Sequence, residues 1–400
     1  MNSIKNRRQF LALLGSAAAA GVAIPLISRW GRSEYPEHLL RHGFAIAGMA
    51  SRERSDVPYF AAPRIDNAGT ILIGNMAGTE LKEIPTTFVS HQVIQNPQNL
   101  NQFFAIQKWG KHAAAVDFSS GQVLDLPLPD GFYFFGHGAF INQGAHILLS
   151  AMDQNKVQGW LLKYDTQTLK LVGEIPSFGT NPHEVQVSQD QKHLIVVNMG
   201  LPDKEREKRN APNGIPSVSC LSRIDIESGR LLSQVDLNKA NYGYSHFLNI
   251  NDSEILCMGR TYDSHKKPEP PAVAYVAAEQ VADLAIDPLF QRITGEALSA
   301  CRMGSSVLIS VPESNNVVLL DLTTRKPVAA YAAKSPRGVI LTPQSDFAFV
   351  SQSDQNQLFM AYSVNEHRLI TLQESQLPLG PFSSQWKAGG AHFSPIIWPA

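Results

Sequence analysis

The sequence predicts an all-β protein, a seven-bladed β-propeller with four-stranded blades around a central channel, and three observations lead to it. Short apolar runs of β type, such as TILIGN and HLIVVNM, recur after residue 55, each bounded by Asn, Asp, Gly, Pro or Ser. Units that begin with a histidine repeat at a regular spacing. A polar turn of one pattern follows the third run of several units.

The histidines mark where the innermost strand of each unit begins. His91, His137 and His183 stand 46 residues apart, and His246 follows after 63 residues. That longer gap contains the charged insert LPDKEREKRNAPNGIPS, and its removal restores the period. Four strands in about 40 to 50 residues is typical of a propeller blade.

The third and fourth strands of a unit are predicted to be joined by a hairpin turn. The pattern is an aspartate followed three residues later by serine or threonine, as in DFSSGQVLDL, DTQTLKLVGE, DIESGRLLSQ and DLTTRKPVAA. These signals place blades near residues 56–87, 88–132, 133–178, 179–240, 241–293, 294–331 and 332–376.

Two parts of this division are unusual. The sixth unit is short, because GSSVLISVPESNNVVLLDL leaves little room for its first two strands. The tail AGGAHFSPIIWPA and the early segment HGFAIAGMAS are expected to pair and close the ring, since an open propeller exposes two sheet edges. Residues 31–400 are therefore predicted to form a single domain.

Composition limits the classes of partner. Charged residues make up 17% of the chain and balance to a net charge of −1, which argues against a nucleic-acid groove or a polybasic membrane surface. Cys220, Cys257 and Cys301 lie far apart without a Cys-x-x-Cys motif, so they are expected to be buried small hydrophobic residues. A small molecule or another protein is the expected partner.

Residues 1–30 are predicted to be a twin-arginine export signal. Arg7 and Arg8 stand just ahead of Phe10 and Leu11, and a mild apolar stretch follows as far as Ile27. The signal predicts a periplasmic location and passage through the twin-arginine translocase after folding. Cleavage after the alanine run and retention as an N-terminal membrane anchor both stay open.

Several stretches together resemble a known family. The export leader, FYFFGHGAFINQGAHILLSAMD, FGTNPHEVQVSQDQKHLIVVNMG, GSSVLI and SPRGVILTPQSDFAFVS, in this order, resemble the bacterial family called domain of unknown function 1513. The resemblance runs from about residue 56 to the end. It implies an exported seven-bladed propeller found beside imelysin-like iron-uptake proteins and di-haem peroxidase-like proteins, with no reaction assigned.

The sequence departs from the usual pattern of that family at two places. The loop after VVNMG is LPDKEREKRNAPNGIP in place of a Gly- and Thr-rich stretch. The end reads QWKAGGAHFSP in place of Trp-Asp-Asn-His, and His392 is the candidate for the final histidine position.

The candidate site is the mouth of the channel, where the inner strands of a propeller begin. The residues expected there are His91, His137, His183, Glu184, His246, Arg337 and His392, with His42 as an additional candidate. His91, His137, His183 and His246 could hold iron, copper or a haem edge, because imidazole suits all three. Sequence alone favours the other interpretation, in which the imidazoles are buried structural ties and no cofactor is bound.

Three functional classes follow from these residues. The sequence has neither a Gly-x-Ser-x-Gly elbow nor a phosphate-binding loop, so a non-enzymatic binding accessory of iron-uptake or redox systems is the leading interpretation. One alternative is a metal- or haem-dependent oxidoreductase that uses the histidines. The other is a lactonase-like propeller hydrolase, which would need acidic residues at several inner-strand starts, where only Glu184 is evident.

Overall fold

A computed structural model shows an all-β protein. It describes residues 42–51, 69–75, 81–201, 218–237, 242–251, 253–261, 272–277, 280–283, 293, 295–341, 347–351, 359–363, 368–371, 386–387, 393–397 and 399. Within these ranges the one helical segment is the 3-10 turn η3 (Asn142–Gly144), and everything else is strand or connection. The predicted all-β class is confirmed.

The described strands form seven antiparallel sheets, most of them built from four strands that follow one another in the chain. The first contains β1 (His42–Ser51), β2 (Gly69–Asn75), β3 (Leu81–Thr86), β29 (Trp386–Lys387) and β30 (Phe393–Ile397). The second contains β4 (Gln92–Gln95), β5 (Gln102–Ile106), β7 (Ala113–Asp117) and β8 (Val123–Asp125). The third contains β6 (Lys108–Gly110), β9 (Phe132–Ile141), β10 (His146–Asp153), β11 (Gln158–Asp165) and β12 (Leu171–Pro176).

The other four sheets have four strands each, in chain order. They contain β13 (Pro182–Val187), β14 (His193–Asn198), β15 (Cys220–Asp225) and β16 (Leu231–Asp236), then β17 (Tyr242–Asn251), β18 (Glu254–Thr261), β19 (Ala272–Ala277) and β20 (Gln280–Asp283). The last two contain β21 (Ser299–Met303), β22 (Ser306–Val311), β23 (Asn316–Asp321) and β24 (Lys326–Ala332), then β25 (Val339–Leu341), β26 (Phe347–Ser351), β27 (Phe359–Ser363) and β28 (Arg368–Thr371).

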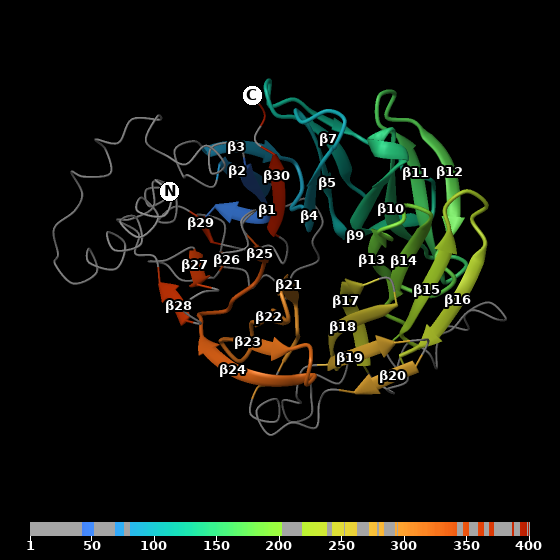
Figure 1. Ribbon diagram of the computed structural model, residues 1–400. Coiled ribbons are helices and arrows are strands. Elements are labelled where there is room, and N and C mark those ends of the chain that lie inside the picture. Colours follow the sequence, from blue (N-terminus) through green and yellow to red (C-terminus); the bar gives the residue numbers. More distant parts are fainter. Residues whose placement is uncertain are drawn as a thin grey trace, which may run out of the picture.

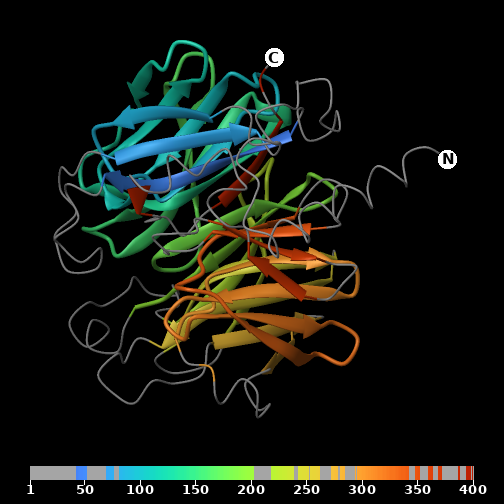
Figure 2. The ribbon, with the colours of Figure 1, turned by 90° about the vertical axis from the view of Figure 1, so that its left-hand side faces the viewer.

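The sheets follow one another around a common centre (Figure 1). The first strand of each successive sheet, for example β9, β13, β17 and β21, lies toward the centre, and the last, for example β12, β16 and β24, lies on the outside (Figure 1). Figure 2 shows the same sheets from the side, stacked around the ring. This is the arrangement of a β-propeller.

The two ends of the described chain meet in one sheet. β30 pairs antiparallel with β1, with Gly43 opposite Ile396 and Ala45 opposite Ser394. The pairing predicted between the tail and the early segment is therefore confirmed. It covers the edge of β1 that would otherwise offer free backbone groups to another chain.

The predicted hairpins between third and fourth strands are also confirmed. Asp225 shows the shared design: its Oδ1 accepts hydrogen bonds from the Ser228 backbone N–H at 2.7 Å and from the Ser228 hydroxyl at 2.6 Å. These bonds favour the ionised carboxylate, so they lower the pKa of Asp225. Asp117, Asp165 and Asp321 make the same pair of bonds in their own turns.

Two features of the strand pattern differ from the prediction. The sixth unit is complete, because β21 (SACRM) precedes GSS and turns into β22 at Gly304, whose φ is +62°. The prediction missed this strand because only Cys301 and Met303 on it are buried. The second difference is β6, an extra short strand that joins the inner side of β9.

The hydrophobic core lies between neighbouring sheets. Side chains of β5 and β7 pack against those of β9, β10 and β11, and side chains of β18 and β19 pack against those of β22 and β23. Cys220, Cys257 and Cys301 are buried free thiols, as predicted, and burial raises the thiol pKa of Cys220 and Cys301 to about 12. In the part of the chain that the structure describes, no helix has the length and apolarity that a membrane span requires. Residues 1–30, with Arg7, Arg8, Phe10 and Leu11, lie outside the described residues.

Candidate functional site

Four histidines from four consecutive sheets meet at the inner strands. The ring centroids of His137 and His183 lie 4.4 Å apart, those of His183 and His246 4.8 Å, and those of His91 and His137 5.0 Å. All four side chains are buried. One nitrogen from each of His91, His137 and His183 can be chosen so that the three atoms lie within 4.8 Å of one another. We call these four residues the histidine cluster.

Irregular strand pairing aims these side chains at a common point. The register of β9 with β10 shifts opposite Ser150, next to His137. The register of β13 with β14 shifts at His183, and that of β17 with β18 shifts directly before His246. A β-bulge bends a strand and redirects the side chains beside it, and such bulges are common next to functional sites.

Ser150 fills the gap that the bulge leaves in the ladder of β9. Its hydroxyl accepts a hydrogen bond from the His137 backbone N–H at 3.2 Å and donates one to the His137 carbonyl at 3.1 Å. The serine is fully buried, so these bonds satisfy backbone groups that water cannot reach. Ser150 thereby fixes the backbone of His137.

Gly136 makes room for the imidazole of His91. Its φ of +104° is a conformation that side chains rarely adopt. A Cβ atom at this position would lie 2.6 Å from Cδ2 of His91 and 3.1 Å from Cβ of Lys108. The close packing of the histidine cluster therefore requires glycine here.

The hydrogen bonds of His183 define its protonation. Nδ1 lies 3.2 Å from the carbonyl oxygen of Phe135, an acceptor, so Nδ1 carries the proton and Nε2 carries the lone pair. Nε2 in turn lies 3.3 Å from Nζ of Lys108, which donates to it. Burial, and then the positive charge of Lys108, hold the pKa of His183 well below its usual range. His183 is a neutral imidazole whose Nε2 faces Lys108.

His246 has a carboxylate behind it. Its Nδ1 lies 3.3 Å from Oε2 of Glu184, and burial lowers the pKa of His246 to about 3 despite the opposing effect of Glu296. The contact is therefore a hydrogen bond from a neutral imidazole to a carboxylate, and the lone pair is on Nε2. Metal-binding histidines commonly have such a carboxylate behind the ring.

Glu184 links the β13 sheet to the β17 sheet through hydrogen bonds. Its Oε2 also accepts a hydrogen bond from the Phe247 backbone N–H at 3.0 Å, and its Oε1 accepts one from Nε2 of Gln186 at 2.7 Å. Gln186 continues the network, since its Oε1 accepts a hydrogen bond from Asn249 at 2.9 Å. The described contacts of Glu184 are therefore those with Phe247, Gln186 and His246, and its predicted pairing with Arg337 stays a prediction.

Lys108 is the functional candidate that sequence reasoning missed. It lies on β6, which pairs with β9 so that Lys108 is opposite Phe135. Its Nζ lies 4.8 Å from the ring centre of Trp109, whose side chain is 47% exposed. The only sequence signal was QKWGKH, a polar and aromatic stretch between two apolar strands that is longer than a simple hairpin needs.

Arg337 and His392 were also predicted at the site, and the described contacts do not place them in the histidine cluster. Arg337 precedes β25 and is half-buried, and its described contacts are backbone ones: its N–H donates to Ser351 at 2.8 Å and its carbonyl accepts from Ser310. His392 lies outside the described residues.

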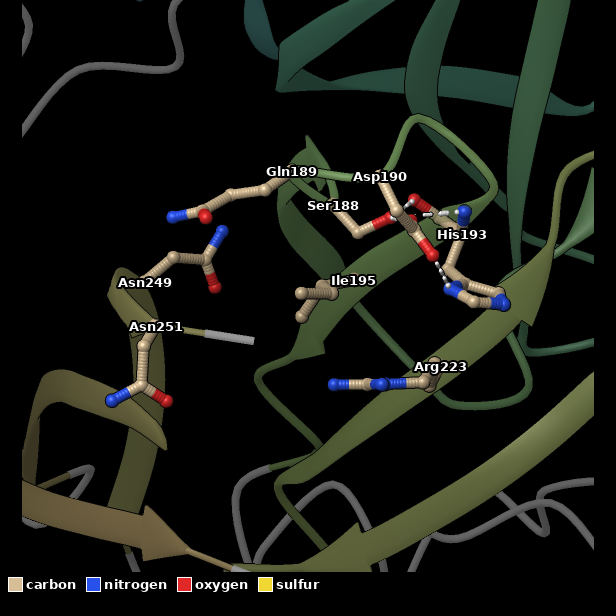
Figure 3. Close-up of a pocket in the computed structure, with 8 residues that line it drawn as sticks. All are labelled: Ser188, Gln189, Asp190, His193, Ile195, Arg223, Asn249 and Asn251. Atoms are coloured by element: carbon tan, nitrogen blue, oxygen red, sulfur yellow. Dashed lines mark hydrogen bonds and ion pairs between the residues drawn. The ribbon is translucent and has the colours of Figure 1, made fainter. Parts of the chain in front are cut away.

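A separate shallow recess lies at the far end of the Glu184 network (Figure 3). Its volume is about 100 Å³, and its lining residues are Ser188, Gln189, Asp190, His193, Ile195, Arg223, Asn249 and Asn251. Several of these groups bond to each other: Ser188 donates to Asp190 at 2.6 Å, and Nδ1 of His193 lies 3.4 Å from Asp190. Most residues that line the recess are polar, and some of their hydrogen-bonding groups bond to each other. The histidine cluster differs because its side chains are buried.

Comparison with known families identifies the chain. The model of a protein family of unknown function, DUF1513, matches residues 84–377. The chain belongs to this family. The resemblance predicted from the sequence motifs is thus confirmed, and no curated protein matches the chain.

Three solved structures are similar to this DUF1513 protein at low sequence identity. Hydrazine synthase of Kuenenia stuttgartiensis is 14% identical, with 76% of this chain and 89% of that chain covered and a TM-score of 0.53. U3-55K and the WD40 repeats of RRP9 are each 10% identical, cover 70% of this chain and 79% and 78% of theirs, and give TM-scores of 0.49 and 0.48. The likeness to the first concerns the fold alone.

The histidine cluster of this DUF1513 protein fits a single transition-metal ion. Nitrogens bound to one tetrahedral ion at about 2.1 Å lie about 3.4 Å apart, so His91, His137 and His183, whose nitrogens lie within 4.8 Å of one another, would have to close by up to about 1.4 Å to bind one ion. Three imidazoles with one position open is a ligand set that suits copper, zinc or iron. The rings pack too closely for a haem between them, at centroid separations of 4.4 to 5.4 Å.

Proposed function

We propose that this protein is a transition-metal-binding β-propeller, with His91, His137 and His183 as the ligands. The observation that carries the proposal is the approach of three buried imidazole nitrogens, from three different sheets, to within 4.8 Å of one another. His246, which touches the rings of both His137 and His183, is the nearest further donor.

The protonation of the cluster is compatible with metal binding. A metal needs neutral imidazoles, and burial keeps His183 and His246 neutral at physiological pH, with the pKa of His246 at about 3. Their Nδ1 atoms bond to the Phe135 carbonyl and the Glu184 carboxylate, so the lone pairs lie on Nε2. Nε2 of His183 also accepts a hydrogen bond from Lys108 at 3.3 Å, so a metal at this atom would have to displace that contact.

The proposal also covers the domain organisation, the cellular location and the partners of the protein. The seven sheets are taken as seven blades of one domain over residues 31–400, and residues 1–30 as the twin-arginine signal. Folded export to the periplasm would allow the metal to be loaded in the cytoplasm, where its identity can be controlled. Iron-uptake or di-haem peroxidase-type proteins are the proposed periplasmic partners, and copper or iron at the site would extend the role to redox chemistry.

Elemental analysis of the full chain purified from the periplasm tests the proposal. We expect close to one copper, iron or zinc ion per chain, and loss of most of it in His137→Ala and His183→Ala. His193→Ala, which alters a half-exposed histidine on β14 outside the cluster, is the matched control and should keep its metal. Purified protein without metal that also takes up none of these ions on addition would refute the proposal.

A further inference from the structure

His246 lies against the same two rings as His91 does. The ring centroid of His246 is 4.8 Å from that of His183 and 5.4 Å from that of His137. The corresponding separations for His91 are 5.2 Å and 5.0 Å. His91 and His246 therefore contact the pair formed by His137 and His183 at nearly equal distances. By the position of its ring, His246 belongs to the histidine cluster as fully as His91.

The tautomer of His246 is set by Glu184. Nδ1 of the imidazole lies 3.3 Å from Oε2 of the carboxylate. An ionised carboxylate can only accept a hydrogen bond, so Nδ1 carries the proton and Nε2 carries the lone pair. The lone pair of Nε2 points away from the carboxylate, because the two nitrogens of an imidazole lie on different sides of the ring. Nε2 is therefore the atom with which His246 can bind a metal.

Hydrogen bonds to the residue after His246 hold Glu184 in place. Its Oε2 accepts a hydrogen bond from the Phe247 backbone N–H at 3.0 Å, and its Oε1 accepts one from Nε2 of Gln186 at 2.7 Å. The same Nε2 of Gln186 donates to the Phe247 carbonyl at 3.1 Å. Glu184 thus fixes both the ring of His246 and the backbone beside it. Metal-binding histidines commonly depend on such a carboxylate for their orientation and their basicity.

On these grounds we propose that His246 is the fourth ligand of the metal and that Glu184 is the residue that positions it. This inference rests on the proposed function, in which His91, His137 and His183 are the first three ligands. His246 has to approach farther than these three, because it lies outside the group whose nitrogens are within 4.8 Å of one another. Four imidazoles complete a tetrahedral set, whereas catalytic metal sites keep one position open for water or substrate. The fourth histidine therefore favours metal carriage or electron transfer over catalysis at the metal.

Pulsed electron paramagnetic resonance of the full chain loaded with copper(II) tests the fourth ligand, because the spectrum counts the coordinated imidazoles. We expect four imidazoles in the unaltered protein and three in His246→Gly. Free imidazole labelled with nitrogen-15 should enter the space left in His246→Gly and restore the fourth nitrogen, which the label identifies. His193→Gly alters a histidine of β14 outside the cluster and should give the spectrum of the unaltered protein, with no labelled nitrogen.

Two measurements test the role of Glu184. Glu184→Gln keeps the size of the side chain and loses its charge, so copper affinity should fall about 10- to 100-fold. Glu174→Gln alters an exposed carboxylate on β12 and should bind copper as the unaltered protein does. In the metal-free protein, nitrogen NMR should show the proton of His246 on Nδ1, a signature that a carboxylate supporting only the sheets would not require.

The outcomes separate this inference from the proposed function. Three imidazoles on copper in the unaltered protein, or the same spectrum in His246→Gly, would overturn the fourth ligand and leave the site of three histidines standing. Equal copper affinity in Glu184→Gln and the unaltered protein, or a proton on Nε2 of His246, would overturn the role of Glu184. Failure of the unaltered protein to bind any copper, iron or zinc would overturn both proposals.

Discussion

The two halves of the ring share one arrangement, in which a buried serine hydroxyl bonds to both the backbone N–H and the carbonyl of one residue near the start of an inner strand. They differ in the side chain of that bonded residue. In the β9 sheet, Ser150 clamps the backbone N–H and carbonyl of His137. On the other side of the ring, Ser310 clamps Ser299 in the same way, and Ser351 clamps Gly338, with N–H to Oγ distances of 3.2 and 2.9 Å. This serine arrangement therefore stabilises the sheet whether or not the bonded residue is a histidine.

This difference shows that the histidines are not a requirement of the blade. Ser299 and Gly338 begin inner strands that pair as regularly as any other, without an imidazole. His91, His137, His183 and His246 are confined to four consecutive sheets and touch one another. Burying neutral imidazoles in contact has a cost in stability at acidic pH, and the proposed metal site would account for their presence.

The largest expected effect is acid destabilisation that comes from the histidine half. Burial lowers the pKa of both His183 and His246, and that of His246 to about 3, so at acidic pH the unfolded chain binds protons that the folded chain excludes. Stability is therefore full above pH 6.5 and falls as the pH decreases. At pH 5 the loss from His246 alone is roughly 2 kcal/mol, and His183 adds to it in the same direction. Urea unfolding at pH 7.5, 6 and 5, with a chelator present, measures it.

The His246→Gln variant tests whether the loss of stability at acidic pH comes from the histidine cluster. The variant removes one titrating group, so we expect roughly 2 kcal/mol of the loss between pH 7.5 and 5 to disappear, the part that comes from the lowered pKa of His246. Unchanged dependence on pH in this variant would place the titration elsewhere in the chain and weaken the contrast between the halves.

The next effect compares two glycines with positive φ, one in each half. Gly136→Ala should cost about 3 kcal/mol or more, because the added methyl adopts a strained φ of +104° and would lie 2.6 Å from the His91 ring. Gly304→Ala, in the β21–β22 turn, adopts φ of +62° with nothing within 4 Å, so about 1 kcal/mol is expected. Urea unfolding of both variants gives the difference, and equal losses would mean that the His91 packing against Gly136 is not tight.

Much of the fold could be predicted because its signals are local. The aspartate turns show it: Asp225 bonds to Ser228 within its own hairpin, so the pattern can be recognised without knowledge of any other sheet. The closure of β1 by β30 followed from the rule that open edges are covered. The β21 strand was missed because its exposed Arg302 and half-buried Ser299 interrupt the apolar pattern.

The site could be predicted only in part, because its contacts join distant segments. The spacing of the histidines indicated that they share one level of the ring, but the bulges that turn them toward each other have no sequence pattern of their own. Lys108 was missed for the same reason. Its position follows from β6 joining β9 instead of its own sheet, and no periodicity announces that pairing.

The smallest expected effect is a change in copper affinity, which distinguishes a serine that positions a histidine from one that only supports the fold. Ser150→Ala and Ser351→Ala each remove a buried hydroxyl that bonds a backbone N–H and carbonyl, so both should lose about 1 to 3 kcal/mol of stability. Only Ser150 fixes the backbone of a histidine. Copper titration should therefore show weaker binding, by about tenfold, in Ser150→Ala and unchanged binding in Ser351→Ala. Equal copper affinity in the two variants would mean that the serine supports only the sheet, and that packing against its neighbours holds His137 in place.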